Sequence, residues 1–220
     1  MSRWRLPWAY YPRWRQVRIH AILDHYRANF FRGKTMMEVG CGDGSIGNFF
    51  YYLGCQVTCC DARQEFLDEV AYRNHEIRTA QCNLEEAWPL PDECFDVILN
   101  LGVLYHLAEP HDCIVESARH CNHLVLDCEV TPSGGVRTCS MPENPPERLA
   151  DEGDDHAFSG MGSRPTPAYI EAAIRDGGME PVMLNTTAYD DHPYPHKLGW
   201  GETGAYRNGM RRLWFAKKTG

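Results

Sequence analysis

Apolar and polar residues follow two different periods along the chain, and these periods predict strands and helices in alternation. Short apolar runs predict buried strands, and apolar residues at a helical period predict amphipathic helices. The expected strands span 35–39, 56–60, 77–80, 95–99, 123–128, 182–184 and 213–216. The expected helices span 16–30, 45–53, 64–72, 111–119 and 167–176. This alternation predicts βαβ units and a mostly parallel sheet.

Glycine, threonine and proline residues mark the expected ends of these helices. Gly33 and Gly54 should end the first two, because glycine adopts the left-handed conformation that follows many helices. Thr166 should cap the last helix, with Pro167 in its first turn.

Two long segments near the C-terminus show neither period and are rich in Pro, Gly and polar residues. Segments of this length inside a compact domain are either functional or disordered. We therefore expect a single domain over residues 1–220. Its expected parts are an N-terminal lid and helix (1–34), a ligand-binding core (35–130) and two insertions (131–165 and 186–210).

The composition is that of a globular protein outside the membrane. Of 220 residues, 43% are hydrophobic and 24% are charged. No apolar run approaches the ~20 residues that cross a bilayer. The basic N-terminus has no apolar run behind it, as a secretory signal would. We expect a cytoplasmic protein without membrane contact, either a monomer or a homodimer.

The ten cysteines do not form a metal-binding pattern. There is no CxxC pair, and no spacing matches a standard zinc site. Several thiols, among them Cys59, Cys60 and Cys128, lie in apolar strand-like runs. This placement is typical of reduced, buried cysteines. The sequence therefore predicts no metal.

Charge argues against general nucleic-acid binding, because the net charge is −8. The segment 1–18 differs from the rest of the chain, since it is aromatic, holds five arginines and has no acid. Three roles are compatible with this segment: a lid over a ligand, a nucleic-acid contact by stacking and charge, and an apolar cap on the domain. We favour the lid, with nucleic acid as the less favoured partner.

A glycine-rich segment joins the first expected strand to the next helix. Gly42, Gly44 and Gly47 match the G-x-G-x-x-G fingerprint of dinucleotide sites, and Asp61 ends the second strand. Glycines there let the backbone turn sharply and approach a ligand. Taken alone, these residues also fit an NAD-dependent oxidoreductase.

The surrounding residues favour a different cofactor. Glu38 precedes the loop and Gly40 adds another glycine, which gives Glu-Val-Gly-Cys-Gly-Asp-Gly. Four ordered segments resemble the motifs of class I S-adenosylmethionine-dependent methyltransferases: 38–44, 57–61, 83–98 and 101–110. The resemblance implies a Rossmann-like, doubly wound α/β fold. Its seven-stranded sheet would be mostly parallel, with helices on both faces and strand seven antiparallel.

The resemblance also implies how S-adenosylmethionine binds. The glycine loop would lie against the methionine part, Asp61 would bind the ribose, and the segment after strand four would face the methyl group. The implied cofactor-binding residues are Glu38, Gly40, Cys41, Gly42, Asp61, Ala62, Asn83, Leu84, Asn100 and Leu101. Asn83 stands where the family usually has Asp, but its carbonyl oxygen still accepts a hydrogen bond from adenine.

His106 is the candidate catalytic base. It follows the expected strand 95–99, at the sheet edge where open α/β sheets bind ligands. Its pKa range suits taking a proton from a hydroxyl. A structural role is an open alternative, and Tyr105 is expected to be a wall residue. We favour a solvated loop, over a base or a metal site, for a second polar cluster: Asp190, Asp191, His192 and His196.

The sequence therefore predicts transfer of a methyl group to an oxygen or nitrogen of a small-molecule acceptor, a metabolite or sugar-like compound. The acceptor would lie between the lid and the two insertions. Residues 102–106 are also similar to transferases that modify the wobble uridine of tRNA with the cofactor or its carboxylated form. Arg119, Arg137 or an N-terminal arginine would then pair with the extra carboxylate. A non-catalytic cofactor-binding or scaffold protein is the alternative of another class.

Overall fold

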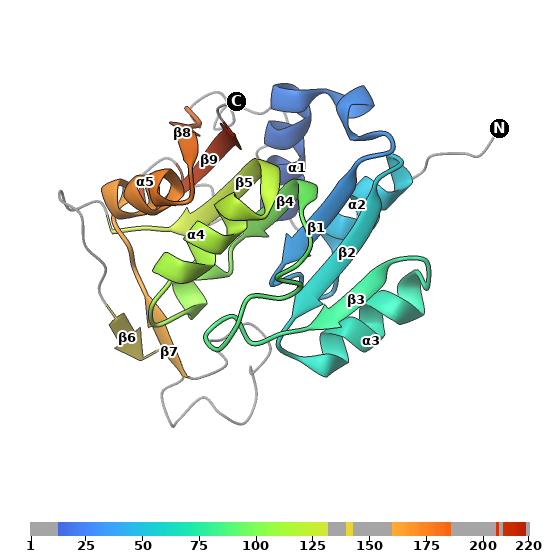
Figure 1. Ribbon diagram of the computed structural model, residues 1–220, viewed down its shortest axis with the longest axis horizontal. Helices are drawn as coiled ribbons and strands as arrows, with labels where there is room; N and C mark the ends of the chain where they lie inside the picture. The colour runs from blue at the N-terminus through green and yellow to red at the C-terminus, as the bar shows by residue number, and fades with distance from the viewer. Residues whose placement is uncertain (1–12, 132–139, 143–159, 186–205, 207–208, 219–220) are drawn as a thin grey trace.

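A computed structural model describes residues 13–131, 140–142, 160–185, 206 and 209–218 (Figure 1). The helices are α1 (Arg13–Tyr26), η2 (Ala28–Phe31), α2 (Ser45–Tyr52), α3 (Gln64–Arg73), η3 (Leu104–His106), α4 (His111–Arg119) and α5 (Pro167–Asp176). The strands are β1 (Thr35–Val39), β2 (Gln56–Asp61), β3 (Arg78–Gln81), β4 (Phe95–Leu101), β5 (Cys121–Glu129), β6 (Ser140–Pro142), β7 (Met161–Ser163), β8 (Met179–Met183) and β9 (Arg211–Lys218).

The central sheet has seven strands in the order β3-β2-β1-β4-β5-β9-β8. The pairs β3–β2, β2–β1, β1–β4 and β4–β5 are parallel. Strand β9 runs antiparallel to both of its neighbours, β5 and β8. The predicted fold class, including the antiparallel seventh strand, is confirmed.

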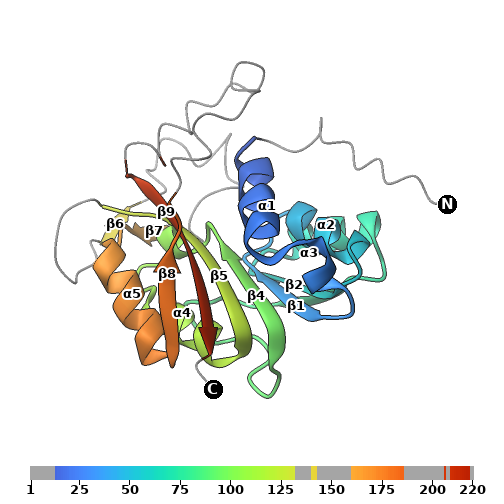
Figure 2. The same cartoon turned by 90° about the horizontal axis from the view of Figure 1, so that it is seen from above.

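Helices cover both faces of this sheet because its strands are apolar on both sides (Figure 2). Successive residues of a strand point to opposite faces. Met36 packs in the cluster under α1, α2 and α3, and Met37 packs in the cluster under α4 and α5. On β9, Phe215 packs in the first of these clusters and Trp214 packs in the second.

The strand order reverses direction between β1 and β4. The chain moves outward from β1 through β2 to β3, and then returns to place β4 on the other side of β1. Ligands of open α/β sheets bind beyond the carboxyl ends of the strands at such a point. The fold therefore locates the site at the ends of β1 and β4.

The first helix begins and ends earlier than its apolar period predicted. It ends at Tyr26, and Arg27 follows with a φ of 66°. A 3-10 turn over Ala28–Phe31 then leads to Gly33. The prediction that Gly33 ends this helix was wrong, because the break in backbone conformation occurs at Arg27.

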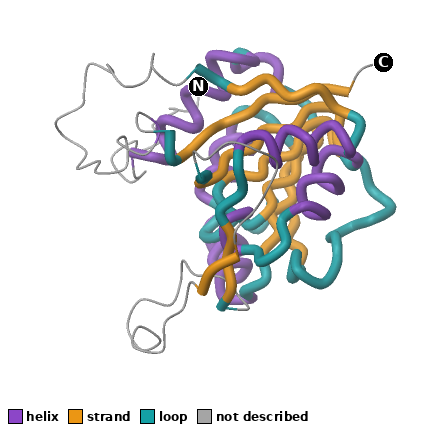
Figure 3. The backbone as a smooth tube through the Cα atoms, turned by 90° about the vertical axis from the view of Figure 1, so that its left-hand side faces the viewer, coloured by secondary structure: helices purple, strands orange, loops and turns teal. Residues whose placement is uncertain are grey.

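A small antiparallel pair of strands occupies part of the segment predicted to be irregular. Ser140–Pro142 pairs with Met161–Ser163, beside the large sheet rather than in it (Figure 3). Strands of three residues are too short to show a period of two. Strand β8 also begins at Met179, earlier than predicted, with Pro181 inside it. Proline is tolerated there because β8 is an edge strand.

The predicted start of α5 is confirmed. Thr166 is fully buried, and its side chain accepts a hydrogen bond from the Tyr169 backbone N–H at 3.2 Å. Pro167 occupies the first turn, where no helical N–H is needed.

Much of the expected lid and of both insertions lies outside the described residues. So do Arg137, Asp190, Asp191, His192 and His196. Within the part of the chain that the structure describes, none of the helices is long and apolar enough to cross a membrane.

Candidate active site

A cavity of about 310 Å³ lies beyond the carboxyl ends of β1, β2 and β4. Nine of the predicted cofactor residues line it, together with the candidate base His106. They are Glu38, Gly40, Cys41, Gly42, Asp61, Ala62, Asn83, Leu84 and Leu101. The fold thus brings four sequence segments into one site.

The glycine loop turns away from β1 by adopting backbone conformations that favour glycine. Gly40, Gly42 and Gly44 all have positive φ angles, between 52° and 67°. Gly40 also allows a close approach, because a Cβ atom there would lie 2.5 Å from Cγ2 of Val103. The loop after β1 and the segment after β4 therefore meet at Gly40.

Glu38 stabilises the glycine loop through a buried hydrogen bond. It is almost fully buried, and its Oε2 accepts a hydrogen bond from the Gly47 N–H at 2.7 Å. Burial raises the pKa of this carboxyl from 4.5 to about 8, although the bond from Gly47 opposes the rise. These contacts support a role in orienting the loop.

Asp61 ends β2 with its carboxylate directed at the same loop. Its Oδ2 accepts from the Gly42 N–H at 2.9 Å, and its Oδ1 accepts from the Arg63 N–H at 3.0 Å. A carboxylate has about four acceptor positions, so further hydroxyl donors can bind.

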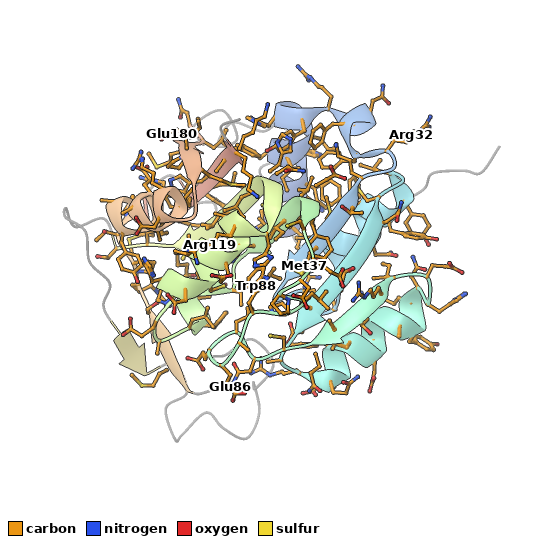
Figure 4. The ribbon with its side chains drawn as sticks, viewed as in Figure 1. Arg32, Met37, Glu86, Trp88, Arg119 and Glu180 are labelled. Atoms are coloured by element: carbon orange, nitrogen blue, oxygen red, sulfur yellow. The ribbon has the colours of Figure 1, made fainter. Side chains whose placement is uncertain are left out.

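Asn83 begins the loop between β3 and β4 (Figure 4 labels Glu86 and Trp88 on that loop). Its Oδ1 accepts from the Glu85 N–H at 3.2 Å, and its Nδ2 donates to Glu86 at 3.0 Å. A carbonyl oxygen has two lone pairs, so one remains for an incoming donor.

Asn100 is the one predicted cofactor residue whose side chain points elsewhere. It is fully buried and does not line the cavity. Its Nδ2 donates to Oγ of Ser117 on α4 at 3.2 Å. Residues alternate between the two faces of β4, so Leu101 is directed to the cavity and Asn100 to α4.

His106 lies at the end of η3, next to Tyr105, with 4.2 Å between the ring centroids. Burial raises the pKa of Tyr105 above its usual value, although Arg211 and Arg18 oppose the rise. Tyr105 is therefore a phenol at neutral pH, able to donate a hydrogen bond and unsuited to act as a base.

Arginine side chains complete the cavity wall: two come from the arginine-rich N-terminal segment expected to form a lid, and the third, Arg211, is marked by no sequence pattern. Arg15, Arg18 and Arg211 line the cavity, and Glu129 lies beside Arg211. Arg18 and Arg211 both pair with buried Asp127. A signal for Asp127 existed, because it is a lone acid in the apolar run of 123–128. No local pattern marks either arginine as its partner.

Metal chemistry finds no support among the described side chains. No group of three or more His, Cys, Asp or Glu residues in that part of the chain is placed to hold a metal ion.

Comparison with known proteins finds similarity to methyltransferases. A family model described as a methyltransferase domain matches residues 37–123. The chain is 28% identical over 184 residues to the ubiquinone biosynthesis O-methyltransferase of Maricaulis maris, covering 72% of this chain and 65% of the relative. It is 28% identical over 155 residues to the tRNA U34 carboxymethyltransferase of Shewanella denitrificans, covering 65% and 42%. The chain thus spans two thirds or less of the length of these two curated relatives.

The fold is similar to that of the N-terminal domain of EvdMO1, determined in the presence of SAH and D-fucose. The TM-score is 0.68 at 17% identity, and the match covers 93% of this chain and 84% of that one. At this identity the likeness shows the fold alone.

Proposed function

We propose that this chain, whose residues 37–123 match a methyltransferase-domain family model, transfers the methyl group of S-adenosylmethionine to an oxygen or nitrogen of a small-molecule acceptor. The observation that carries this proposal is the convergence of the glycine loop, Asp61, Leu84 and Leu101 on one cavity. Relatives named as O-methyltransferases favour oxygen as the acceptor atom.

The side chains present fit an adenosyl sulfonium. Asp61 supplies acceptors for ribose hydroxyls, and Leu84 and Phe66 supply apolar contacts for the adenine. Arg15 and Arg18 place guanidinium groups on the same cavity, where a carboxylate can pair with them.

The cofactor supplies an activated methyl group, so the protein contributes mainly binding, orientation and exclusion of water. Leu101 and Val103 present apolar surface beyond the end of β4. His106 lies on the same wall, where it can take the proton from an acceptor hydroxyl. Tyr105 can orient that hydroxyl by donating a hydrogen bond.

Calorimetric titration with S-adenosylmethionine tests the proposal. Asp61→Ala should weaken binding by roughly 10- to 100-fold, because hydrogen bonds to a carboxylate are worth about 1.5–3 kcal/mol. Unchanged affinity would show that Asp61 does not hold the ribose. No binding to the unaltered protein would reject the proposed function itself.

A second candidate keeps the fold and changes the transferred group. The similarity to a tRNA U34 carboxymethyltransferase supports it, and Arg211 beside Tyr105 gives the cavity a group that can pair with an extra carboxylate. Arg119, one of the arginines first considered, is ion-paired with Glu116 on α4 and does not line the cavity. The net charge of −8 counts against tRNA. Titration with the carboxylated cofactor decides, since tighter binding of that compound would favour this candidate.

A further inference from the structure

Asp127 is a fully buried carboxylate at the end of β5, where apolar side chains surround it on the same strand. It pairs in register with Leu101 of β4 and Leu213 of β9. Burying an ionised carboxylate is costly unless charges and hydrogen bonds compensate for it. Its partners therefore indicate what the residue does.

Three side chains from distant parts of the chain meet at Asp127. Nη2 of Arg18, on α1, and Nη1 of Arg211, at the start of β9, bond to Oδ1 at 2.5 and 2.7 Å. The Tyr206 hydroxyl donates to Oδ2. Burial opposes ionisation of Asp127, but the two guanidinium groups outweigh it and lower the pKa of the carboxyl.

Both arginines reach from Asp127 to the cavity. Arg18 also donates to the Leu101 carbonyl at 3.2 Å, and a Cβ atom on Gly102 would lie 2.8 Å from its Nη2. The guanidinium therefore rests on the backbone at the end of β4. This is where the chain turns from the sheet into the cavity wall.

Arg211 is held from a second side. Its Nη2 bonds to Glu129 at 3.1 Å, and its guanidinium lies 5.0 Å from the centre of the Tyr105 ring. Arg164 lies 5.2 Å from the same ring and pairs with the other oxygen of Glu129. Tyr105 is thus fixed beside Arg211 on the cavity wall.

We infer that Asp127 is a positioning residue of the cofactor site, which acts by holding the guanidinium group of Arg18 against the end of β4 and that of Arg211 beside Tyr105. The two positively charged guanidinium groups stay together because the carboxylate oxygen that both of them contact is negatively charged. Without the charge they repel each other, and the hydrogen bond from Arg18 to the Leu101 carbonyl is weakened. The inference rests on the proposed function, and it adds a residue that never touches the ligand.

A double-mutant cycle measured with S-adenosylhomocysteine tests this inference without knowledge of the acceptor. Asp127→Asn keeps the shape but removes the charge, and should weaken binding by about tenfold. In the Arg18→Gln background, Asp127→Asn should weaken binding by about threefold or less. The effect that Asp127 exerts through Arg18 is already lost in that background. A tenfold loss in both backgrounds would overturn the inference.

Asp96→Asn is the matched control. Asp96 is also on the sheet and pairs with Lys34, but it lies at the opposite end of β4 from the cavity. The Asp96→Asn variant should have a lower melting temperature and an unchanged affinity for S-adenosylhomocysteine. If it weakens binding as much as Asp127→Asn does, loss of stability accounts for the effect and the inference fails.

If Asp127→Asn does not fold, Arg18→Lys provides the second arm. It keeps the charge but loses the planar pair of donors that joins Asp127 to the Leu101 carbonyl. Positioning predicts about a threefold or larger loss of affinity, and unaltered affinity would overturn the inference. Failure of the unaltered protein to bind would instead reject the proposed function.

Discussion

At the scale of single residues, burial decides what each polar group can do. Glu38 and Asp61 are both acids at strand ends of the same site. Both line the cavity, but burial raises the pKa of Glu38, whereas the Asp61 carboxylate accepts two backbone N–H groups. The sequence predicted the positions of both acids, and the folded surroundings of each acid give it a different role.

Glu38 should make stability depend on pH. Between its ordinary pKa of 4.5 and the folded value of about 8, the folded chain keeps a proton that the unfolded chain has released. The stability from this group is therefore complete below pH 4.5 and is lost as the pH rises toward 8. Glu38→Gln removes this titration and should flatten the melting temperature between about pH 5 and pH 8. Glu76→Gln, on an exposed side chain, should keep the slope of the unaltered protein.

His106 should affect turnover more than binding. Loss of a general base costs roughly 100-fold or more in rate. His106→Ala should therefore keep its affinity for S-adenosylhomocysteine within about twofold and reduce turnover roughly 100-fold. Transfer of labelled methyl to an extract of small metabolites measures this. Normal turnover would assign His106 the structural role.

At the scale of elements, periodicity and caps predicted the regular helices well. The helix after Thr166 begins where the threonine and proline place it, because those signals act within one turn. The first helix ended early for a reason that side-chain type does not reveal. Arg27 has φ 66° and ψ 150°, a conformation that favours glycine.

Arg27→Gly should therefore stabilise the fold. Relief of about 1–3 kcal/mol of backbone strain exceeds the roughly 0.5–1 kcal/mol entropic cost of glycine. We expect the melting temperature to rise by about 2–4 °C, measured by calorimetry. Arg32→Gly is the matched control, because Arg32 has an ordinary φ of −62°. A rise in that variant and none in Arg27→Gly would contradict the assignment of strain.

At the scale of the whole molecule, the site exists only in the folded chain. Its lining residues come from α1, α2, α3 and η3, from the ends of β1, β2, β4 and β5, from the segment after β3, and from the start of β9. A ligand that needs all of them binds the native state and not the unfolded chain. Such a ligand raises stability in proportion to the logarithm of its concentration.

S-adenosylhomocysteine should therefore raise the melting temperature. At 100 times its Kd the expected gain is about 2.7 kcal/mol, or about 5–10 °C for a chain of this size. NAD at the same concentration should give no shift. An equal shift with NAD would revive the oxidoreductase interpretation of the glycine loop.

The sequence by itself predicted the strands of the central sheet, most of the helix bounds, the glycine loop and the acids at the ends of β1 and β2. These features depend on periodicity and on residues a few positions apart, so they can be read locally. Asn83 and Leu84 followed from the resemblance to the methyltransferase motifs, and both line the cavity.

Only the tertiary structure decided which side chains complete the cavity wall. Asn100 and Leu101 are neighbours in sequence, yet the face of β4 sends one to α4 and the other to the cavity. Arg18 and Asp127 are 109 positions apart and meet because β5 lies beside β4 under α1. A buried carboxylate selects its partners by three-dimensional proximity, and no local pattern in the chain records that proximity.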